Sequence, residues 1–317
     1  MNTFGDTFTF TSFGESHSAA IGGVLDGVPA GLHINFDMIT EALNRRAGRN
    51  PQPTAGISPR ALREADQVEW LSGVLDGVTL GTPIAFLIRN RDARPEDYEA
   101  LKHSFRPAHA DSTYAAKYGI RDWRGGGRAS ARETAARVVA GNIAAQLLAG
   151  HGIHIAAELI QVGNLTDPAR FAELIRRYQA EGDSIGGIIR CTVSGLPAGL
   201  GEPIFDKLQA HLAYAILSIN ACKGFDYGSG FDGVTQPGSV ANRNSGGMLG
   251  GITDGTTLSF RCVFKPTPTT PKALEDMQNE GMPNATITNR SDACVAVRAV
   301  PVVEAMTALV IANFINL

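Results

Sequence analysis

Cysteine and charge are both scarce in this sequence of 317 residues. The four cysteines lie far apart and form no C-x-x-C pair, which argues against a zinc site or a redox dithiol. We therefore expect free thiols, as in a reducing compartment. Charged residues make up 19% of the chain, and 28 Lys and Arg oppose 31 Asp and Glu, so the net charge is -3. That balance excludes a generally basic protein that coats nucleic acid.

Targeting and membrane signals are missing as well. The first six residues contain neither the basic nor the apolar segment of a secretory signal. No apolar run approaches the roughly 18 residues that a membrane span needs, and the stretch 305–315 is typical of a core helix. Hydrophobic residues, at 44%, suffice for a large core. We therefore expect a cytoplasmic, globular protein.

Glycine, in contrast, is abundant, with 36 residues. This is well above the average usage of about 7%, and it indicates many turns or many close approaches of backbone to ligand. Hydrophobic periodicity predicts both strands and helices. The predicted strands are 8–13, 21–25, 67–74, 82–88, 188–193 and 258–264. The predicted helices are 37–47, capped by Asp37, then 131–148, one opening at Asp167-Pro168, 206–219 and 302–314.

Two short strings occur twice in the chain. The hexapeptide GVLDGV occupies 23–28 and 73–78, and the tetrapeptide PAGL occupies 29–32 and 197–200. Each PAGL follows a predicted strand and precedes a predicted helix. The repeated strings have two alternative explanations. One is recurring turn chemistry, and the other is a duplicated strand-turn-helix unit with two pseudo-symmetric halves. No linker separates the halves, so we expect one continuous core, with long loops at 52–59 and 265–280.

The segment 104–137 has the highest density of arginines, and within it three glycines, 125–127, lead into the longest predicted helix. A helix N-terminus after a glycine loop presents free N–H groups and binds anions such as phosphate. Arginines there are unfavourable for the helix dipole, but they suit a bound anion. The alternative is a solvated basic face. Ser130 also fits a capping box with Glu133, which is compatible with ligand contact.

Two histidines stand out as proton carriers. His17 and His109 each lie among small residues and near an acid, and imidazole titrates near neutral pH. Together with Asp111 they could also bind a metal ion, although nothing fixes their spacing. Further anion ligands are available in Lys265 and in Arg290, just before Asp292. The set suits a small polyanionic substrate and a phosphate-bearing cofactor.

Several long strings resemble the signature segments of the chorismate synthase family. They are FGESH at 13–17, FRPAHAD at 105–111, RGGGRASARET at 124–134, SINACKG at 218–224, KPT at 265–267 and RAVPVVEAM at 298–306. The resemblance runs from about residue 7 to the C-terminal helix, nearly the whole chain.

The resemblance implies a fold, an activity and partners. The fold would be α+β, a β-α-β sandwich with helices packed between antiparallel sheets and internal pseudo-symmetry, in one domain over 1–317. The activity would be that of a lyase, which converts 5-enolpyruvylshikimate 3-phosphate to chorismate and phosphate by anti-1,4-elimination and requires reduced FMN. It implies a homotetramer that receives reducing equivalents from an external flavin reductant, with no membrane or nucleic-acid partner.

The resemblance also implies roles for individual residues. His17 would protonate the leaving phosphate, His109 would protonate reduced flavin, and Asp292 would act in removal of the ring proton. The cofactor contacts would be Arg128, Ala129, Ser130, Asn220, Ala221, Gly250, Lys265, Pro266, Thr267, Pro268, Thr269 and Arg290. Substrate or NADP would be bound by Arg46, Arg49, Arg106 and Arg132.

The sequence departs from the family pattern at two histidines, which are Ser245 and Ser291 here. The loops before Ser184 and Asn244 also look shortened. Two other functions therefore stay open: a non-catalytic paralogue that binds flavin or a phosphometabolite, and a metal-dependent phosphatase that uses His17, His109 and Asp111.

Overall fold

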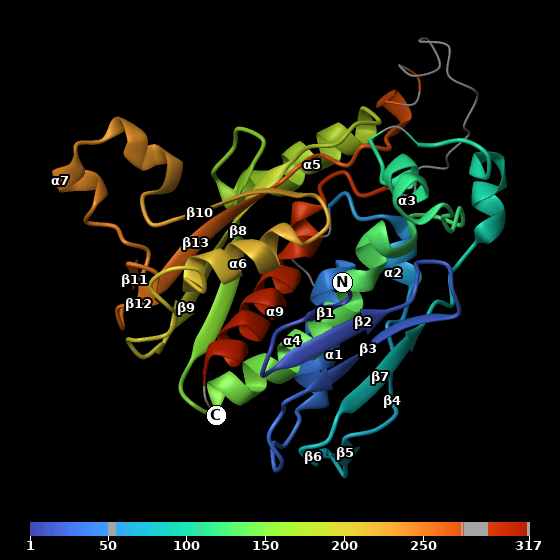
Figure 1. Cartoon of the computed structure of the whole chain (residues 1–317). Helices are drawn as coiled ribbons and strands as arrows, with labels where there is room; N and C mark the ends of the chain where they lie inside the picture. Colours follow the sequence, from blue (N-terminus) through green and yellow to red (C-terminus); the bar gives the residue numbers. More distant parts are fainter. Residues whose placement is uncertain (50–54, 107, 274, 276–290, 316–317) are drawn as a thin grey trace.

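Two antiparallel sheets enclose a layer of helices in this protein (Figure 1). The structure is a computed structural model, and it describes residues 1–49, 55–106, 108–273, 275 and 291–315. The expected α+β class, with helices packed between antiparallel sheets, is confirmed.

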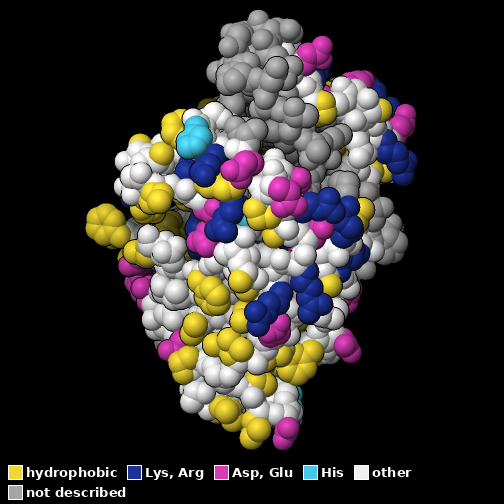
Figure 2. Space-filling view, turned by 90° about the vertical axis from the view of Figure 1, so that its right-hand side faces the viewer, with side chains coloured by type: hydrophobic (Ala, Val, Ile, Leu, Met, Phe, Trp, Pro, Cys, Tyr) yellow, Lys and Arg dark blue, Asp and Glu magenta, His cyan; other side chains and the backbone are white. Residues whose placement is uncertain are grey.

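The first sheet has the strand order β1-β2-β3-β7-β4, and every neighbouring pair is antiparallel. Its strands are β1 (Thr3–Phe4), β2 (Thr9–Phe13), β3 (Ala20–Asp26), β7 (Ile84–Arg89) and β4 (Val68–Trp70). Alternate side chains of β3 and β7 point inward and are fully buried, as period-2 alternation predicts. The outer face also carries apolar groups, among them Phe13 and Val24, and Figure 2 shows apolar side chains gathered over it.

The second sheet has the order β10-β13-β9-β8 and is also antiparallel. Its strands are β8 (His154–Val162), β9 (Gly187–Ser194), β10 (Cys222–Tyr227) and β13 (Leu258–Phe264). The sequence did not reveal β8 or β10. Their inward-facing positions are only partly buried, and alanine and glycine interrupt the apolar alternation that identifies a strand.

Four helices fill the space between the sheets: α1 (Phe36–Ala47), α4 (Thr134–Ala149), α6 (Leu208–Leu217) and α9 (Ala296–Phe314). The helices α4 and α9 cross so closely that a Cβ on Gly141 would lie 2.4 Å from the Cα of Ala305. Only glycine permits this approach. Among the described residues, α9 is the one helix long and apolar enough to cross a membrane, but 67% of it is buried inside the fold.

Three element boundaries differ from the prediction. Asn35, not Asp37, caps α1, because its side chain accepts hydrogen bonds from the N–H groups of residues 37 and 38. The helix α9 begins at Ala296 rather than 302, and it accommodates Pro301 in its second turn. The predicted strand 67–74 is divided into β4 and β5 (Val74–Leu75), because Gly73 has a positive φ of 81° between them.

The remaining elements are short or peripheral. They are α2 (Pro59–Arg63), β6 (Val78–Thr79), η1 (Pro95–Leu101), α3 (Asp111–Tyr118), η2 (Gly127–Ala129), η3 (Ala131–Glu133), η4 (Pro168–Arg170), α5 (Phe171–Ala180), η5 (Gly230–Thr235), α7 (Gly238–Ala241), β11 (Met248–Leu249) and β12 (Ile252–Thr253). All four cysteines are free thiols, as expected.

The PAGL repeat marks two structurally equivalent halves. The hydroxyl of Thr79 accepts a hydrogen bond from Leu32 N (3.0 Å) and donates to Pro29 O (2.7 Å). In the other half, the hydroxyl of Thr253 accepts from Leu200 N (2.9 Å) and donates to Pro197 O (2.7 Å). The strand order β2-β3-β7-β4 likewise matches β8-β9-β13-β10. The chain therefore contains a duplicated unit, whereas the GVLDGV strings only share turn chemistry.

Replacing either threonine of this matched pair by valine should destabilise the protein equally. Thr79 and Thr253 are 2% and 3% exposed, and each substitution removes two part-buried hydrogen bonds, at about 1–3 kcal/mol. Denaturant unfolding measures this. The exposed Thr40, whose hydroxyl only bonds the carbonyl one turn back, is the control, and Thr40→Val should change stability by about 0.5 kcal/mol or less. Unequal effects of the two core variants would contradict the equivalence of the halves.

Candidate functional site

A large cavity of about 1810 Å³ opens at one end of the helical layer. Segments far apart in the sequence line it: the start of the chain and the loop after β2, the turn before α4, residues 220–221, residues 265–268 and the segment leading into α9. Among its lining side chains are nine Lys and Arg residues and seven Asp and Glu residues. The site is therefore polar and has an excess of positive charge.

The glycine turn before α4 forms one wall of this cavity. Gly125 and Gly127 have positive φ angles of 84° and 53°, and two short 3-10 turns follow before the α-helix begins. The hydroxyl of Ser130 accepts a hydrogen bond from Arg132 N (3.2 Å), so this serine caps the turn and also lines the cavity. The expected capping box is incomplete, because the Glu133 carboxylate lies 2.7 Å from Arg137.

Arg106 and Asp111 form a two-pronged ion pair at the cavity wall. The Arg106 Nε and Nη2 atoms donate to the two carboxylate oxygens of Asp111 at 2.9 and 2.8 Å. Burial would raise the pKa of Asp111, but these hydrogen bonds hold it below its usual value. Within the described ranges, no group of three His, Cys, Asp or Glu could hold a metal ion. His17, His109 and Asp111 therefore do not come together as such a group in this structure.

His109 lines the cavity and is hydrogen bonded through Nε2 to the hydroxyl of Thr269. Burial and the nearby charge of Arg106 lower the pKa of His109 to about 4. The imidazole is therefore neutral near pH 7 in the absence of a ligand. An anion bound beside it would raise this pKa.

His17 lies behind the wall, in the loop between β2 and β3, and is 5% exposed. Its Nδ1 is 2.9 Å from the hydroxyl of Ser16, and its ring packs edge-on against Tyr98 with the ring centroids 4.9 Å apart. A Cβ at position 125 would lie 2.4 Å from the same Nδ1, so Gly125 is required there. The structure thus brings His17 next to the cavity, but its side chain does not line it.

Asp292 also lines the cavity and is held in place by two donors. Its carboxylate accepts from Ser58 N (2.8 Å) and from Arg298 Nη1 (2.7 Å), and it is 8% exposed. Thr267 fixes the same segment, because its hydroxyl donates to the carbonyl of residue 292. Arg298 also donates through Nε to the carbonyl of Arg46.

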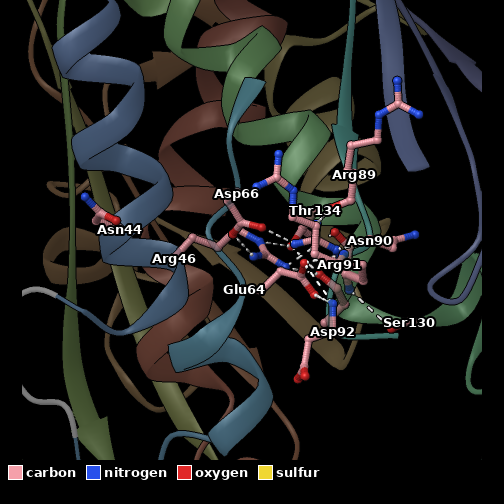
Figure 3. Close-up of polar contacts among 12 residues, drawn as sticks. Asn44, Arg46, Glu64, Asp66, Arg89, Asn90, Arg91, Asp92, Ser130 and Thr134 are labelled. Atoms are coloured by element: carbon pink, nitrogen blue, oxygen red, sulfur yellow. Dashed lines mark hydrogen bonds and ion pairs between the residues drawn. The ribbon is translucent and has the colours of Figure 1, made fainter. Parts of the chain in front are cut away.

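A buried ion cluster joins Arg46, Asp66 and Arg132. Arg46 donates from Nη1 to Asp66 Oδ2 (3.3 Å), from Nε to the Thr134 hydroxyl (2.9 Å) and from Nη2 to the carbonyl of residue 131 (2.8 Å). Figure 3 shows Arg46 and Asp66 pointing toward one another beneath Thr134. Arg132 binds the other carboxylate oxygen of Asp66. The three residues line the cavity but are 7% exposed or less.

The predicted cofactor contacts fall into three groups. Arg128, Ala129, Ser130, Asn220, Ala221, Lys265, Thr267 and Pro268 line the cavity. Pro266 and Thr269 belong to the same segment without lining it. Gly250 lies in the turn between β11 and β12, away from the cavity lining, and Arg290 lies outside the described residues. The cofactor role that the resemblance implies for Gly250 therefore stays a prediction that the lining of this cavity does not support.

Two side chains, Asn220 in the wall and Arg49 outside the cavity lining, have unfilled hydrogen-bonding capacity. The Nδ2 of Asn220 donates to the carbonyl of residue 129 (2.7 Å), but its Oδ1 is buried and has no partner among the described residues. Arg49 likewise has buried Nε and Nη2 atoms that find no hydrogen-bond acceptor in the described part of the chain.

Sequence reasoning missed Asp66, Tyr98 and Arg298 as lining residues. Asp66 belongs to no recognisable motif, and its position beside Arg46 and Arg132 follows only from tertiary packing. Arg298 lies in the string at 298–306 that resembles the family, so the sequence did mark this position. The string does not reveal that Arg298 pairs with Asp292.

Comparisons with known proteins agree with this geometry. The chorismate synthase family profile matches residues 8–315. The chain is 43% identical to the chorismate synthase of Christiangramia forsetii over 349 aligned positions, which cover 99% of this chain and 97% of that protein. It is 44% identical to the chorismate synthase of Porphyromonas gingivalis over 354 positions, covering 99% and 95%. A crystal structure of chorismate synthase superposes with a TM-score of 0.76 at 28% identity, covering 98% of this chain and 92% of that one. Both alignments exceed the length of this chain, so the relatives contain segments that it lacks.

The protonation of His109 can be tested by NMR titration of the ligand-free protein. We expect its ring signals to titrate near pH 4, because burial and Arg106 disfavour the imidazolium. Since an unfolded histidine titrates near pH 6.5, its neutral form contributes stability above that pH, and this contribution is lost as the pH falls toward 4.

His109→Gln identifies the signal, and it should reduce the loss of stability between pH 6.5 and 4. A midpoint near 6.5 in the parent protein would contradict the burial argument.

Proposed function

The chain belongs to the chorismate synthase family, and we propose that it converts 5-enolpyruvylshikimate 3-phosphate to chorismate and phosphate by anti-1,4-elimination. The observation that carries this proposal is the cavity itself. It places the carboxylate of Asp292, the imidazole of His109 and an excess of Lys and Arg side chains around one space, with His17 directly behind its wall. A small substrate with one phosphate and two carboxylate groups matches that surplus of positive charge.

The residues that line the cavity also fit reduced FMN, which we propose as the cofactor. The buried, unpaired Oδ1 of Asn220 is an acceptor for a flavin N–H or hydroxyl group once its side chain turns to meet it. Arg128 and Lys265 are cations for the cofactor phosphate, and the glycine turn before α4 brings backbone N–H groups to the same wall. Bound in this cavity, the reduced flavin would supply the electron density that assists departure of the phosphate.

The side chains of this chain would then manage the protons and charges of the elimination. We assign to Asp292, which Arg298 holds by a hydrogen bond, the acceptance of the ring proton. We assign to His17 the donation of a proton to the departing phosphate, for which its side chain turns from behind the wall into the cavity. His109 holds a proton once the anionic ligands beside it raise its low pKa. The fixed arginines stabilise charge that develops on the phosphate without reorganising, which is commonly the largest catalytic contribution.

The two replaced histidines lie in different places. Ser291 lines the cavity, so the loss of an imidazole there removes a donor from the site. Ser245 lies outside the cavity lining, and its hydroxyl donates to Asp254 Oδ2 (3.2 Å). The catalytic set of His17, His109 and Asp292 is independent of both positions, which favours an active enzyme over a binding paralogue.

We also propose a cytoplasmic homotetramer that receives reduced flavin from a separate reductase. The outer face of the first sheet supports association, because Phe13 and Val24 are 44% and 36% exposed there beside other apolar groups. Of the two arginines expected to contact NADP, Arg46 and Arg49, we retain Arg49 in this proposal. Its buried Nε and Nη2 atoms have no hydrogen-bond acceptor in the described part of the chain.

An anaerobic assay with chemically reduced FMN tests the activity. We expect chorismate and phosphate in equal amounts, and none without reduced FMN. His17→Ala, His109→Ala and Asp292→Asn should each lower kcat by about 10²–10⁴-fold, because each removes a proton carrier or base. The exposed His154 of β8 is the matched control, and His154→Ala should retain full activity.

Phosphate release without chorismate, abolished by a chelator, would instead indicate a metal-dependent phosphatase. Tight flavin binding with no turnover would indicate the binding paralogue.

The assembly is tested by analytical ultracentrifugation of the parent protein and of Val24→Lys. We expect a tetramer for the parent and a smaller species for the variant, because a lysine on the apolar outer face of β3 opposes burial of that face. Val263→Lys, a comparably exposed position (37%) on the second sheet, is the control. A monomeric parent would contradict the proposed assembly.

A further inference from the structure

Asp66 lies at the centre of the most heavily charged buried cluster in the described part of the chain. Its side chain is 2% exposed, and each of its two carboxylate oxygens bonds a different guanidinium, that of Arg46 and that of Arg132. The cluster forms part of the cavity wall.

The arginines themselves are tied to the protein at every nitrogen. Arg132 donates from Nε to Asn90 Oδ1 (2.8 Å) and from Nη2 to the carbonyl of residue 89 (3.3 Å), besides its bond to Asp66. Arg46 is likewise bonded at each nitrogen, by Asp66, Thr134 and the carbonyl of residue 131. These bonds and the burial of both side chains fix the two guanidinium groups in place, so that their charge and position are set before a ligand binds.

The backbone at Asp66 indicates a specific requirement for this carboxylate. Its φ is +49°, in the left-handed region, which suits Asp, Asn and Gly, so the backbone limits the residue type here while the two arginines demand the charge. Burial by itself would raise the pKa of Asp66, but the charges of Arg46 and Arg132 lower it overall, so the group stays ionised. Without that charge, two guanidinium groups would face one another in a poorly solvated wall, and each would repel the other.

The cluster also connects to the catalytic carboxylate. The carbonyl of Arg46, at the end of α1, accepts a hydrogen bond from Arg298 Nε (2.8 Å), and the Nη1 of Arg298 holds Asp292 (2.7 Å). Two hydrogen bonds, both donated by Arg298, therefore connect the backbone of Arg46 to the carboxylate of Asp292.

We propose that Asp66 is a positioning residue, the shared counter-ion that fixes Arg46 and Arg132 in the cavity wall. Through Arg46 and Arg298, it would also keep the carboxylate of Asp292 in its position. The proposal rests on the proposed function, because it assigns to Asp66 a contribution to the same site. It predicts that a free carboxylate can replace the side chain of Asp66, which a purely packing role would not allow.

Two substitutions at this position separate charge from packing. Asp66→Gly suits the positive φ and leaves a hole the size of an acetate ion between the two guanidinium groups. Asp66→Asn also tolerates the left-handed backbone, but it fills the hole with a neutral amide. Asp226→Asn is the distant control, since Asp226 bonds both Nε and Nη2 of Arg261 on the second sheet, outside the cavity.

The experiment measures kcat/KM and the melting temperature of each variant in acetate and in chloride at equal ionic strength. We expect Asp66→Gly and Asp66→Asn to lose about 100-fold in kcat/KM, as is typical when one partner of a buried ion pair is removed. Acetate should restore about 10-fold or more to Asp66→Gly and raise its melting temperature by about 3 °C, because it binds only the folded state. Asp66→Asn should gain nothing from acetate, and Asp226→Asn should keep its kcat/KM.

Two outcomes would overturn the proposal. One is kcat/KM for Asp66→Asn close to that of the parent, which would show that the charge is dispensable, even if Asp66→Gly does not fold. The other is an equal response of both variants to acetate. Failure of the proposed function is distinguishable, because the parent itself would then form no chorismate, while the acetate-dependent melting temperature would still report on Asp66.

Discussion

Positive charge held in a poorly solvated wall is the constraint on which the site depends. A cavity for a polyanion requires several guanidinium groups close together, and buried like charges repel unless acceptors are supplied. This chain supplies them locally: Asp111 pairs with Arg106, Asp292 with Arg298, and Asp66 with both Arg46 and Arg132. The acidic groups are fewer than the basic ones, so a net positive field remains for a ligand.

The duplicated scaffold explains where that wall is found. Both halves share the order of four strands and the threonine bridge to a PAGL turn. The site, however, is built at one end only, where the turn before α4, the loop after β2 and the segment before α9 meet. The duplicated strands form a rigid sandwich. The connecting segments, which differ between the halves, carry the residues of the site. This division is common, because loops tolerate variation that a packed core does not.

Sequence patterns predicted the regular parts of this arrangement well. The strands β3, β7, β9 and β13 have clear alternation because one face of each is fully buried. The sequence did not predict the strand β8, because its inward-facing side chains include alanine and are only partly buried. The start of α9 was misplaced because a proline usually marks a helix boundary, whereas Pro301 is accommodated inside this helix.

The sequence by itself determined the family likeness, the glycine turn before α4, the free thiols and the identity of the residues with chemistry to offer. Tertiary structure decided which of those residues meet. It brought Asp292 to Arg298 and Ser58, put Gly250 outside the cavity lining, and paired Asp66 with arginines 20 and 66 positions away in the chain. The physical reason is that motifs record local conformation and residue type, whereas the protonation of His109 and the immobility of Arg46 arise from burial and from charges contributed by other segments.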